Sequence, residues 1–327
     1  MTDSAIIPSS STPTALAETD ALAAFGEFLR LRVADGDASP ATLATYHAGV
    51  SAFVTWCETA GVSPATATES DIEAYRAAMR AEGLARSTVA ARLAAVRRFF
   101  EAATWRGLRA DNPAAGIKAP RDRTSAEERI KFLPRDYIGR LFAVCPGDTL
   151  QGKRDRALLA LFALHGPRVA ELAGLDIAAV DLVSDPASIR ILGKGSKART
   201  LYPVKTVRDT LAAWLAVRPS DGDPVAVFIS LQANQEGPAG HRMTARSIRR
   251  RVDHYLAESG LKRAGVSCHS LRHSFGTWSA SAGAPVAAIS AAMGHASIET
   301  TGVYVRVADA IAQNPAAYLE RWAGLAS

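Results

Sequence analysis

The chain has 327 residues, which is long enough for two domains with cores, and its hydrophobic content of 48% excludes a wholly disordered protein. Its longest apolar run, 157–164, is too short to span a membrane. Its three cysteines are scattered without a CxxC pair and the N-terminus lacks a secretory signal, so we expect a reduced cytoplasmic protein without a disulfide framework or zinc site. The net charge is +6, and residues 119–327 contain 27 Lys and Arg against 19 Asp and Glu, which favours a polyanionic partner such as nucleic acid, although ordinary solubility charge explains it equally well.

Helical patterns alone occupy residues 20–111, which follow a polar segment, 1–19, that we expect to be flexible. Apolar residues recur at helical spacing in four stretches, which are 21–32, 40–59, 69–82 and 87–106. Ser39 precedes the second stretch and Ser87 opens the fourth, and both are expected N-caps. These patterns predict a small bundle of about four helices.

Three arginines of the fourth stretch, Arg92, Arg97 and Arg98, lie mainly off its apolar stripe. Such charges more often mark a solvated helix face, and they also suit an edge that contacts DNA. Arginines that bind phosphate look like any other surface arginines in a sequence, so both interpretations stay open here.

A polar, proline-bearing stretch, 112–129, has the composition of a linker. Beyond it, residues 130–310 combine helical patterns with two β-rich runs around GKGS, which predict a hairpin over 188–204. Further segments predict a helix, a short strand and a basic helix, which are 206–217, 225–230 and 244–261. The tail, 311–327, contains a predicted helix over 315–323, with Asn314 as its N-cap. We therefore predict a mainly α protein of two domains, a helical bundle and an α-rich domain with a small β-sheet or hairpin.

Three motifs in the second half contain residues suited to one reaction, and they are HGPRVAEL (165–172), CHSLRHSFGTW (268–278) and MGHASIETTGVYVRV (293–307). When a side-chain hydroxyl cleaves a phosphodiester, arginine binds the non-bridging oxygens through its planar fork and histidine handles protons near neutral pH. A lysine on a mobile turn can protonate the leaving oxygen. No acidic cluster of the metal-ligand type accompanies these motifs, so we expect arginines to replace Mg²⁺ electrostatically, without any cofactor.

In this order the motifs resemble those of the tyrosine recombinases of the phage integrase class, and the layout is closest to the Xer-type enzymes over roughly 20–310. The resemblance implies a SAM-like, core-binding first domain and a catalytic second domain. It also implies six catalytic residues, with Glu171 as the acidic support of the first: Arg168, Lys194 (general acid), His269, Arg272, His295 and Tyr304 (nucleophile). It leaves His273 as a structural neighbour.

The same resemblance implies the reaction and the partners. Tyr304 would form a 3′-phosphotyrosyl link and release a free 5′-hydroxyl, and strands would be exchanged through a Holliday junction. The partners would be double-stranded DNA with a short inverted repeat, three further recombinase subunits of the same or a second kind, and a translocase or accessory activator. The protein would then be associated with the nucleoid, and its tail would pack on a neighbouring protomer or fold back on its own domain.

Several residues keep alternative interpretations. Arg168 and Glu171 are spaced like an ordinary surface salt bridge. His269 and His273 lie four residues apart, but no third ligand or adjacent glutamate supports a zinc site. Lys197 competes with Lys194 for the role of general acid. Expected contacts with the DNA backbone outside the first domain are Lys197, Arg199, Arg246, Arg249 and Arg250.

Two other functions use the same sequence features. A type IB topoisomerase shares this chemistry and would relax one duplex, and a non-catalytic relative would bind DNA beside an active partner. The DNA sequence recognised depends on side-chain geometry rather than on motifs, so the sequence leaves it open. It also leaves open whether the reaction resolves chromosome dimers or integrates and excises a mobile element.

Overall fold

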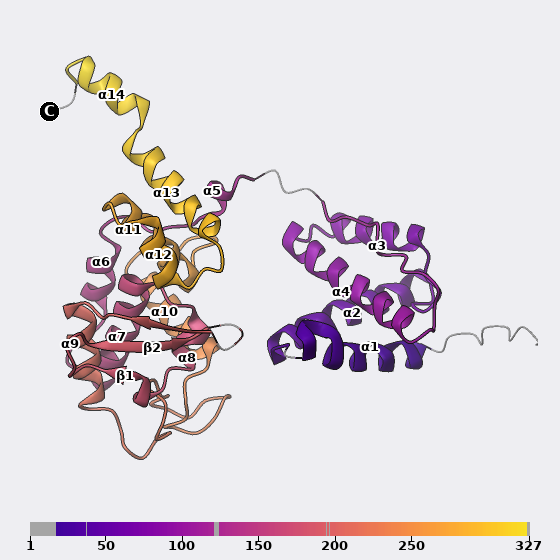
Figure 1. Ribbon diagram of the computed structural model, residues 1–327, viewed down its shortest axis with the longest axis horizontal. Coiled ribbons are helices and arrows are strands. Elements are labelled where there is room, and N and C mark those ends of the chain that lie inside the picture. The colour runs from indigo at the N-terminus through magenta and orange to yellow at the C-terminus, as the bar shows by residue number, and fades with distance from the viewer. Residues whose placement is uncertain (1–17, 37, 121–123, 194, 196, 326–327) are drawn as a thin grey trace, which may run out of the picture. The chain divides into compact units, whose positions relative to one another are not determined.

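The computed structural model describes residues 18–36, 38–120, 124–193, 195 and 197–325. They form two compact units that divide between Arg123 and Thr124, and both are largely helical (Figure 1). The only sheet in the described residues has three strands, in the order β1-β2-β3, all antiparallel. The predicted fold class is therefore confirmed. Lys194, the expected general acid, lies outside the described residues.

The first unit is a bundle of four α-helices with a short 3₁₀ turn, which are α1 (Glu18–Arg32), η1 (Val33–Gly36), α2 (Pro40–Ala60), α3 (Glu69–Ala81) and α4 (Arg86–Trp105). Ser39 caps α2 as expected, because its side chain accepts a hydrogen bond from the backbone N–H of Thr42. Ser87 does not cap α4, which begins one residue earlier with Ala85 at the N-cap position. The five apolar residues of the predicted stripe are all buried in one core, and they are Val89, Leu93, Val96, Phe99 and Phe100.

The predicted linker is too long at both ends. Ala114 and Ile117 are buried in the core of the first unit, where Arg97 donates hydrogen bonds to both of their carbonyl oxygens, at 3.3 and 2.9 Å. At the other end, α5 (Ala126–Arg129) packs on α13 (Ile298–Ala312) of the second unit, with an ion pair of 2.6 Å between Glu127 and Arg306. Proline and charge make a segment look like a linker, but two buried apolar residues dock its first part and an ion pair ties its last part.

The second unit is built around a helix that is buried over most of its length, α7 (Leu150–His165). Its other elements are α6 (Tyr137–Val144), α8 (Val169–Ala173), η2 (Ile177–Ala179), β1 (Val180–Asp181), β2 (Ser188–Leu192), β3 (Ala198–Leu201), α9 (Lys205–Leu215), α10 (Ala245–Glu258), α11 (Cys268–Ser281), α12 (Val286–Met293), α13 (Ile298–Ala312) and α14 (Pro315–Trp322). The hairpin β2–β3 and the capped tail helix α14 were predicted. The strand over 225–230 was wrong, because Ala226 and Ile229 make only isolated bridges.

The C-terminal segment differs from the rest of the second unit. Figure 1 shows α14 extending away from the other helices. Leu319 and Trp322 on this helix are 62% and 85% exposed. Apolar side chains of this size stabilise a fold when burial removes them from water, so these two contribute little to stability in this position.

Across the part of the chain that is described, no helix is both long and apolar enough to cross a bilayer.

Candidate active site

The first motif places Arg168 and Glu171 at a sharp change of chain direction. Helix α7 ends at His165, and the C-cap residue Gly166 has a φ of 58°. A Cβ at this position would lie 2.6 Å from Phe275, so glycine satisfies both the backbone conformation and the packing. Arg168 then occupies the N-cap of α8, and its backbone N–H donates a hydrogen bond of 2.7 Å to the Glu171 carboxylate.

Glu171 is the centre of a buried ion-pair cluster rather than half of a surface salt bridge. Its side chain is 3% exposed and accepts hydrogen bonds from the Arg168 guanidinium at 2.9 Å and from both terminal nitrogens of Arg199 at 2.8 Å. Burial opposes ionisation of Glu171, yet the hydrogen bonds from Arg199 and Arg168 hold its pKa below the usual value. The carboxylate therefore stays charged and fixes both guanidinium groups.

Arg199 was expected to contact the DNA backbone, but its guanidinium is engaged inside the second unit. Besides binding Glu171, it donates through Nε to the carbonyl oxygen of Ala292, at 2.9 Å, which is near the end of α12. Gly294 follows with a φ of 62°, and a Cβ there would lie 2.9 Å from Arg199. Arg199 thus ties β3 to α8 and to the segment that carries His295, and its side chain is only 13% exposed.

Arg272 lies deepest in the site, with 2% of its surface exposed. Its guanidinium donates to the carbonyl oxygens of Gly166 and Met293, each at 2.6 Å. It thereby joins the ends of α7 and α12 to α11. Burial, and after it the positive charge of Arg168, lowers the pKa of Arg272 to about 10, so the group is still cationic at neutral pH.

Tyr304 on α13 is 4% exposed and lies among histidines. Its hydroxyl oxygen is 3.0 Å from Nδ1 of His273, and its ring stacks on that of His295, with centroids 6.2 Å apart. A Cβ at Gly276 would lie 2.8 Å from the tyrosine ring, so only glycine lets α11 approach this closely. His269 packs edge-on against His273 with ring centroids 4.5 Å apart.

The electrostatics of the site follow from this crowding. Burial raises the pKa of Tyr304, although Arg272 and Arg168 work against the rise. Burial, with Arg272 and Arg168 nearby, lowers the pKa of His295 to about 4, so its ring is neutral at pH 7. The site therefore combines the fixed guanidinium cations of Arg168, Arg199 and Arg272 with neutral histidines and a neutral phenol. Such a set can bind an anion and place a nucleophile next to it.

The second unit brings together five of the six catalytic residues predicted from sequence, and Lys194 is not described. Sequence reasoning missed the contact of His273 with the phenol and left that residue as a neighbour. A signal was available, because His269 and His273 are four apart on α11 and so lie on one face. The partner of His295 was also missed, and it is Thr301, whose hydroxyl oxygen is 2.8 Å from the histidine Nδ1.

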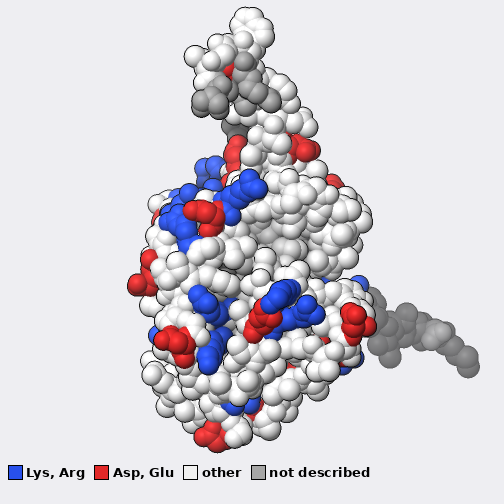
Figure 2. Space-filling view, turned by 90° about the vertical axis from the view of Figure 1, so that its left-hand side faces the viewer, with Lys and Arg blue, Asp and Glu red and all other residues white. Residues whose placement is uncertain are grey.

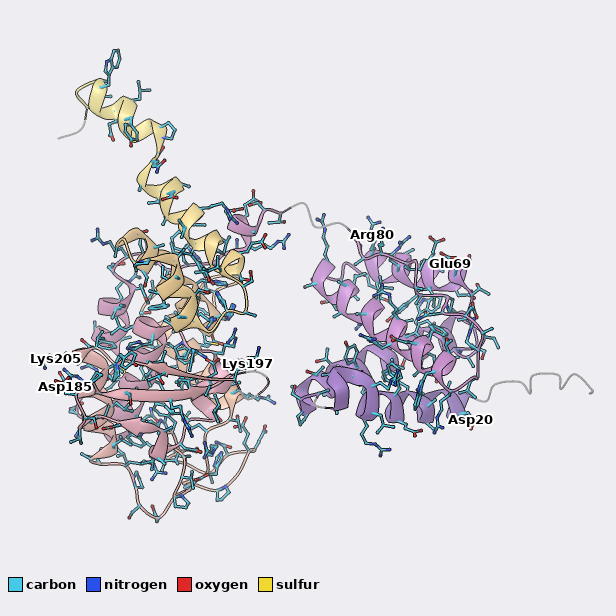
Figure 3. All side chains as sticks on the ribbon, viewed as in Figure 1. Asp20, Glu69, Arg80, Asp185, Lys197 and Lys205 are labelled. Carbon is cyan, nitrogen blue, oxygen red and sulfur yellow. The ribbon has the colours of Figure 1, made fainter. Side chains whose placement is uncertain are left out.

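The predicted DNA-contacting residues fall into two groups. Arg97 and Arg199 are engaged inside the protein, and Arg98 pairs with Glu101 at 2.6 Å. Arg92 is half-buried, whereas the remaining four are exposed, and they are Lys197, Arg246, Arg249 and Arg250. Figure 3 shows Lys197 at the end of the β2–β3 hairpin. On the face in Figure 2, basic side chains lie next to acidic ones, so positive charge there is locally compensated.

Comparison with known proteins connects this geometry to a family. Residues 131–310 match the phage integrase family, and residues 24–107 match the N-terminal SAM-like domain of phage integrases. The two matched segments contain most of the helical bundle and the whole candidate site. More than half of the chain therefore matches the family.

Individual relatives agree with this match. The tyrosine recombinase XerC of Actinobacillus succinogenes is 33% identical over 297 residues, which are 88% of this chain and 92% of the relative. The tyrosine recombinase XerD of Caulobacter vibrioides is 34% identical over 243 residues, 72% of this chain and 76% of the relative. These relatives are recombinases, so they do not favour the topoisomerase that the motifs alone left open.

Solved structures show the same fold. The XerH site-specific recombinase bound to palindromic difH substrate, in a post-cleavage complex, has a TM-score of 0.69 at 19% identity, covering 93% of this chain and 85% of that chain. A lambda integrase dimer bound to a COC′ core site has a TM-score of 0.64 at 15% identity, covering 87% of this chain and 76% of that chain. The chain therefore belongs to the phage integrase family and is an Xer-like tyrosine recombinase, an enzyme that cuts and rejoins DNA at specific sites.

Proposed function

We propose that the catalytic set of this recombinase is Arg168, Lys194, His269, Arg272, His295 and Tyr304, with Glu171 as a positioning residue. The observation that carries the proposal is the convergence of α8, α11, α13 and the end of α12. Arg168 and Arg272 donate hydrogen bonds to the carbonyl oxygens of Gly294 and Met293, and His273 and His295 lie against Tyr304. Arg168 and Arg272 hold the non-bridging oxygens of the scissile phosphate, and His269 and His295 donate hydrogen bonds to it. In this arrangement fixed cations stabilise the charge that grows in the transition state.

The proposed reaction conserves the phosphodiester energy. The Tyr304 oxygen forms a bond to phosphorus, the bond to the 5′-oxygen breaks, and the 5′-oxygen takes a proton. The products are a 3′-phosphotyrosyl link and a 5′-hydroxyl. In rejoining, the 5′-hydroxyl of another strand attacks the link and the tyrosine leaves. Neither direction requires ATP, because the covalent intermediate keeps the bond energy.

We expect Lys194→Ala to slow cleavage far more with an ordinary 5′-oxygen than with a 5′-bridging phosphorothiolate. Sulfur leaves without being protonated, so a lost general acid matters little for that substrate, whereas general acid catalysis contributes about 10²–10⁴-fold with oxygen. The measurement is single-turnover formation of the covalent adduct on both substrates. Equal defects would move the role to another group, and Lys197→Ala is the matched variant for that comparison.

The DNA partner is proposed to be a duplex with a short inverted repeat. Exposed basic residues at the start of α10 and on the hairpin supply backbone contacts, and they are Arg246, Arg249, Arg250 and Lys197. Such contacts release counterions, so affinity falls steeply as salt rises. Their removal therefore weakens binding to all sequences alike. The enzyme would act in the cytoplasm, at the nucleoid.

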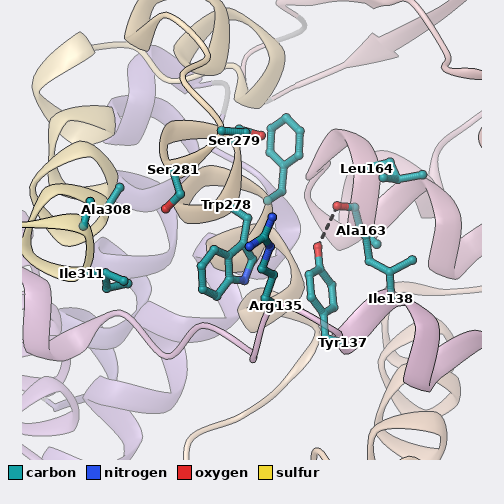
Figure 4. A pocket seen from close by; sticks show the side chains of 13 residues that line it. Arg135, Tyr137, Ile138, Ala163, Leu164, Trp278, Ser279, Ser281, Ala308 and Ile311 are labelled. Carbon is teal, nitrogen blue, oxygen red and sulfur yellow. Dashed lines mark hydrogen bonds between the residues drawn. The ribbon is translucent and has the colours of Figure 1, made fainter. Parts of the chain in front are cut away.

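The proposed assembly on DNA is a tetramer, of one recombinase or two, that an accessory protein or translocase activates. A pocket of about 460 Å³ near the end of α13 supports exchange of α14 between protomers (Figure 4). Its walls are mainly apolar and include Leu164, Trp278 and Ile311. The exposed Leu319 and Trp322 of another protomer are apolar like the pocket walls. Burying each of these side chains there would stabilise the assembly by about 1.5–3 kcal/mol.

We expect Trp322→Ala to weaken assembly of the tetramer on DNA while a single protomer still binds its half-site. The tryptophan contributes to the exchanged contact and not to the phosphate site. Gel-shift titration resolves the two steps, because complexes with one, two and four protomers migrate differently. Leu325→Ala, which changes another exposed apolar residue beyond α14, is the matched control. Unchanged assembly in Trp322→Ala would favour a tail that folds back on its own domain.

The proposed function is tested by capturing covalent adducts. The protein is incubated with nicked, fragmented DNA from its source organism, denatured in detergent, and the attached DNA is sequenced. Adducts through the 3′ end that gather on one short inverted repeat support the proposal and identify the site. Adducts scattered over all sequences would indicate a topoisomerase, and no adducts even with added cell extract would indicate a non-catalytic protein.

A further inference from the structure

The hydroxyl of the proposed nucleophile has one hydrogen-bonding partner among the described residues. Nδ1 of His273 lies 3.0 Å from the Tyr304 oxygen, and the two ring centroids are 5.8 Å apart with planes tilted by 50°. When the histidine carries its proton on Nε2, Nδ1 accepts the hydrogen bond from the phenol. This is the geometry that a proton acceptor requires before an attack by oxygen.

The other two histidines of the site are oriented differently. The ring of His295 lies nearly parallel to that of Tyr304, with centroids 6.2 Å apart and an interplanar angle of 16°, and its Nδ1 is engaged with Thr301. His269 is next to His273 rather than next to the phenol, and it is exposed. Among the described residues, only His273 has a ring nitrogen within hydrogen-bonding distance of the Tyr304 hydroxyl.

We propose that His273 is a further catalytic residue, which accepts the Tyr304 proton as the tyrosine attacks the scissile phosphate and returns it during rejoining. The inference rests on the proposed function and deepens it. In cleavage, the O–H bond of Tyr304 breaks, Nδ1 takes the proton, and the phenolic oxygen bonds to phosphorus while the 5′-oxygen leaves with a proton from the general acid. In rejoining, His273 donates that proton to the departing phenol.

The surroundings of His273 keep its ring neutral, although the same surroundings make the imidazole a weaker base. Burial, followed by the neighbouring His269, Arg272 and His295, lowers its pKa to about 4, so the ring is neutral at pH 7 and its lone pair is available. These groups come from α11 itself and from the segment after α12, and Tyr304 faces the ring from α13. A phosphodiester bound by the arginines adds negative charge nearby and so makes the imidazole more basic during the reaction.

The decisive variant is His273→Asn, because its amide reaches roughly the position of Nδ1. Asparagine can still accept the hydrogen bond from Tyr304, but it cannot take up the proton near neutral pH. We expect the single-turnover rate of adduct formation to fall by about 10²-fold or more on a suicide substrate that carries the captured inverted repeat. His254→Gln, on the exposed side of α10, is the control for replacing a histidine by an amide and should cleave at the wild-type rate.

The second arm replaces Tyr304 by a more acidic fluorinated tyrosine in both the wild type and His273→Asn. A phenol that ionises by itself does not need a proton acceptor, so the defect of His273→Asn should shrink at least about 10-fold with the analogue. Normal cleavage by His273→Asn, or a defect that the analogue leaves unchanged, would overturn the inference. Adducts formed by the wild type show separately that the proposed function holds, and their absence would overturn both.

Discussion

Tyr304→Phe is expected to abolish covalent attachment to DNA while DNA affinity stays nearly the same. Only one hydroxyl is lost, and the remaining ring still packs on Gly276 and stacks on His295. The hydrogen bond to His273 disappears, which costs about 1 kcal/mol of stability, a small effect beside the complete loss of the nucleophile. Adducts are measured on denaturing gels, and affinity by titration of labelled DNA.

Tyr255→Phe is the matched control for that variant. It also removes one buried hydroxyl from the second unit, where the phenol donates a hydrogen bond of 3.0 Å to Asp155. This variant should lose stability, because a hydrogen bond to a charged group contributes about 1.5–3 kcal/mol, and it should still form adducts. Adducts that persist in Tyr304→Phe would contradict the assignment of the nucleophile.

Arg199→Ala is expected to have the largest effect of any substitution outside the proposed catalytic set. Removing one partner of a buried ion pair destabilises a protein by about 3 kcal/mol, because the other charge stays buried without it. Here the Glu171 carboxylate would retain only Arg168, and the carbonyl oxygen of Ala292 would lose its donor. We therefore expect both a lower free energy of unfolding, measured in urea, and cleavage slowed at least about 10²-fold.

The double variant Glu171→Gln, Arg199→Ala separates the two effects. Neutralising the carboxylate removes the uncompensated charge, so the double variant should recover most of the lost stability. It should not recover cleavage, because Arg168 then lacks the charged carboxylate that holds its guanidinium. Arg190→Ala, on the neighbouring strand β2 with an exposed side chain, is the control and should change stability by less than about 0.5 kcal/mol. A stable Arg199→Ala protein would show that the cluster does not support the fold.

The sequence by itself determined what depends on local patterns and on motif order. Helical periodicity and capping predicted the bundle, and a glycine-bearing turn between β-rich runs predicted the hairpin. The motifs around Arg168, Arg272 and Tyr304 predicted the family and the members of the site. These features could be predicted because each is encoded within a few neighbouring residues, or in an order along the chain that one family shares.

The tertiary structure alone decided which charged side chains are available and which are engaged. Arg97 and Arg199 looked like surface arginines, yet one docks the segment after the bundle and the other locks Glu171. The segment 225–230 has the composition of a strand but lacks a neighbouring strand to pair with along its length. The contact of His273 with Tyr304 joins residues 31 positions apart. Pairings of this kind depend on how helices pack together, and periodicity within one helix carries no information about its partner.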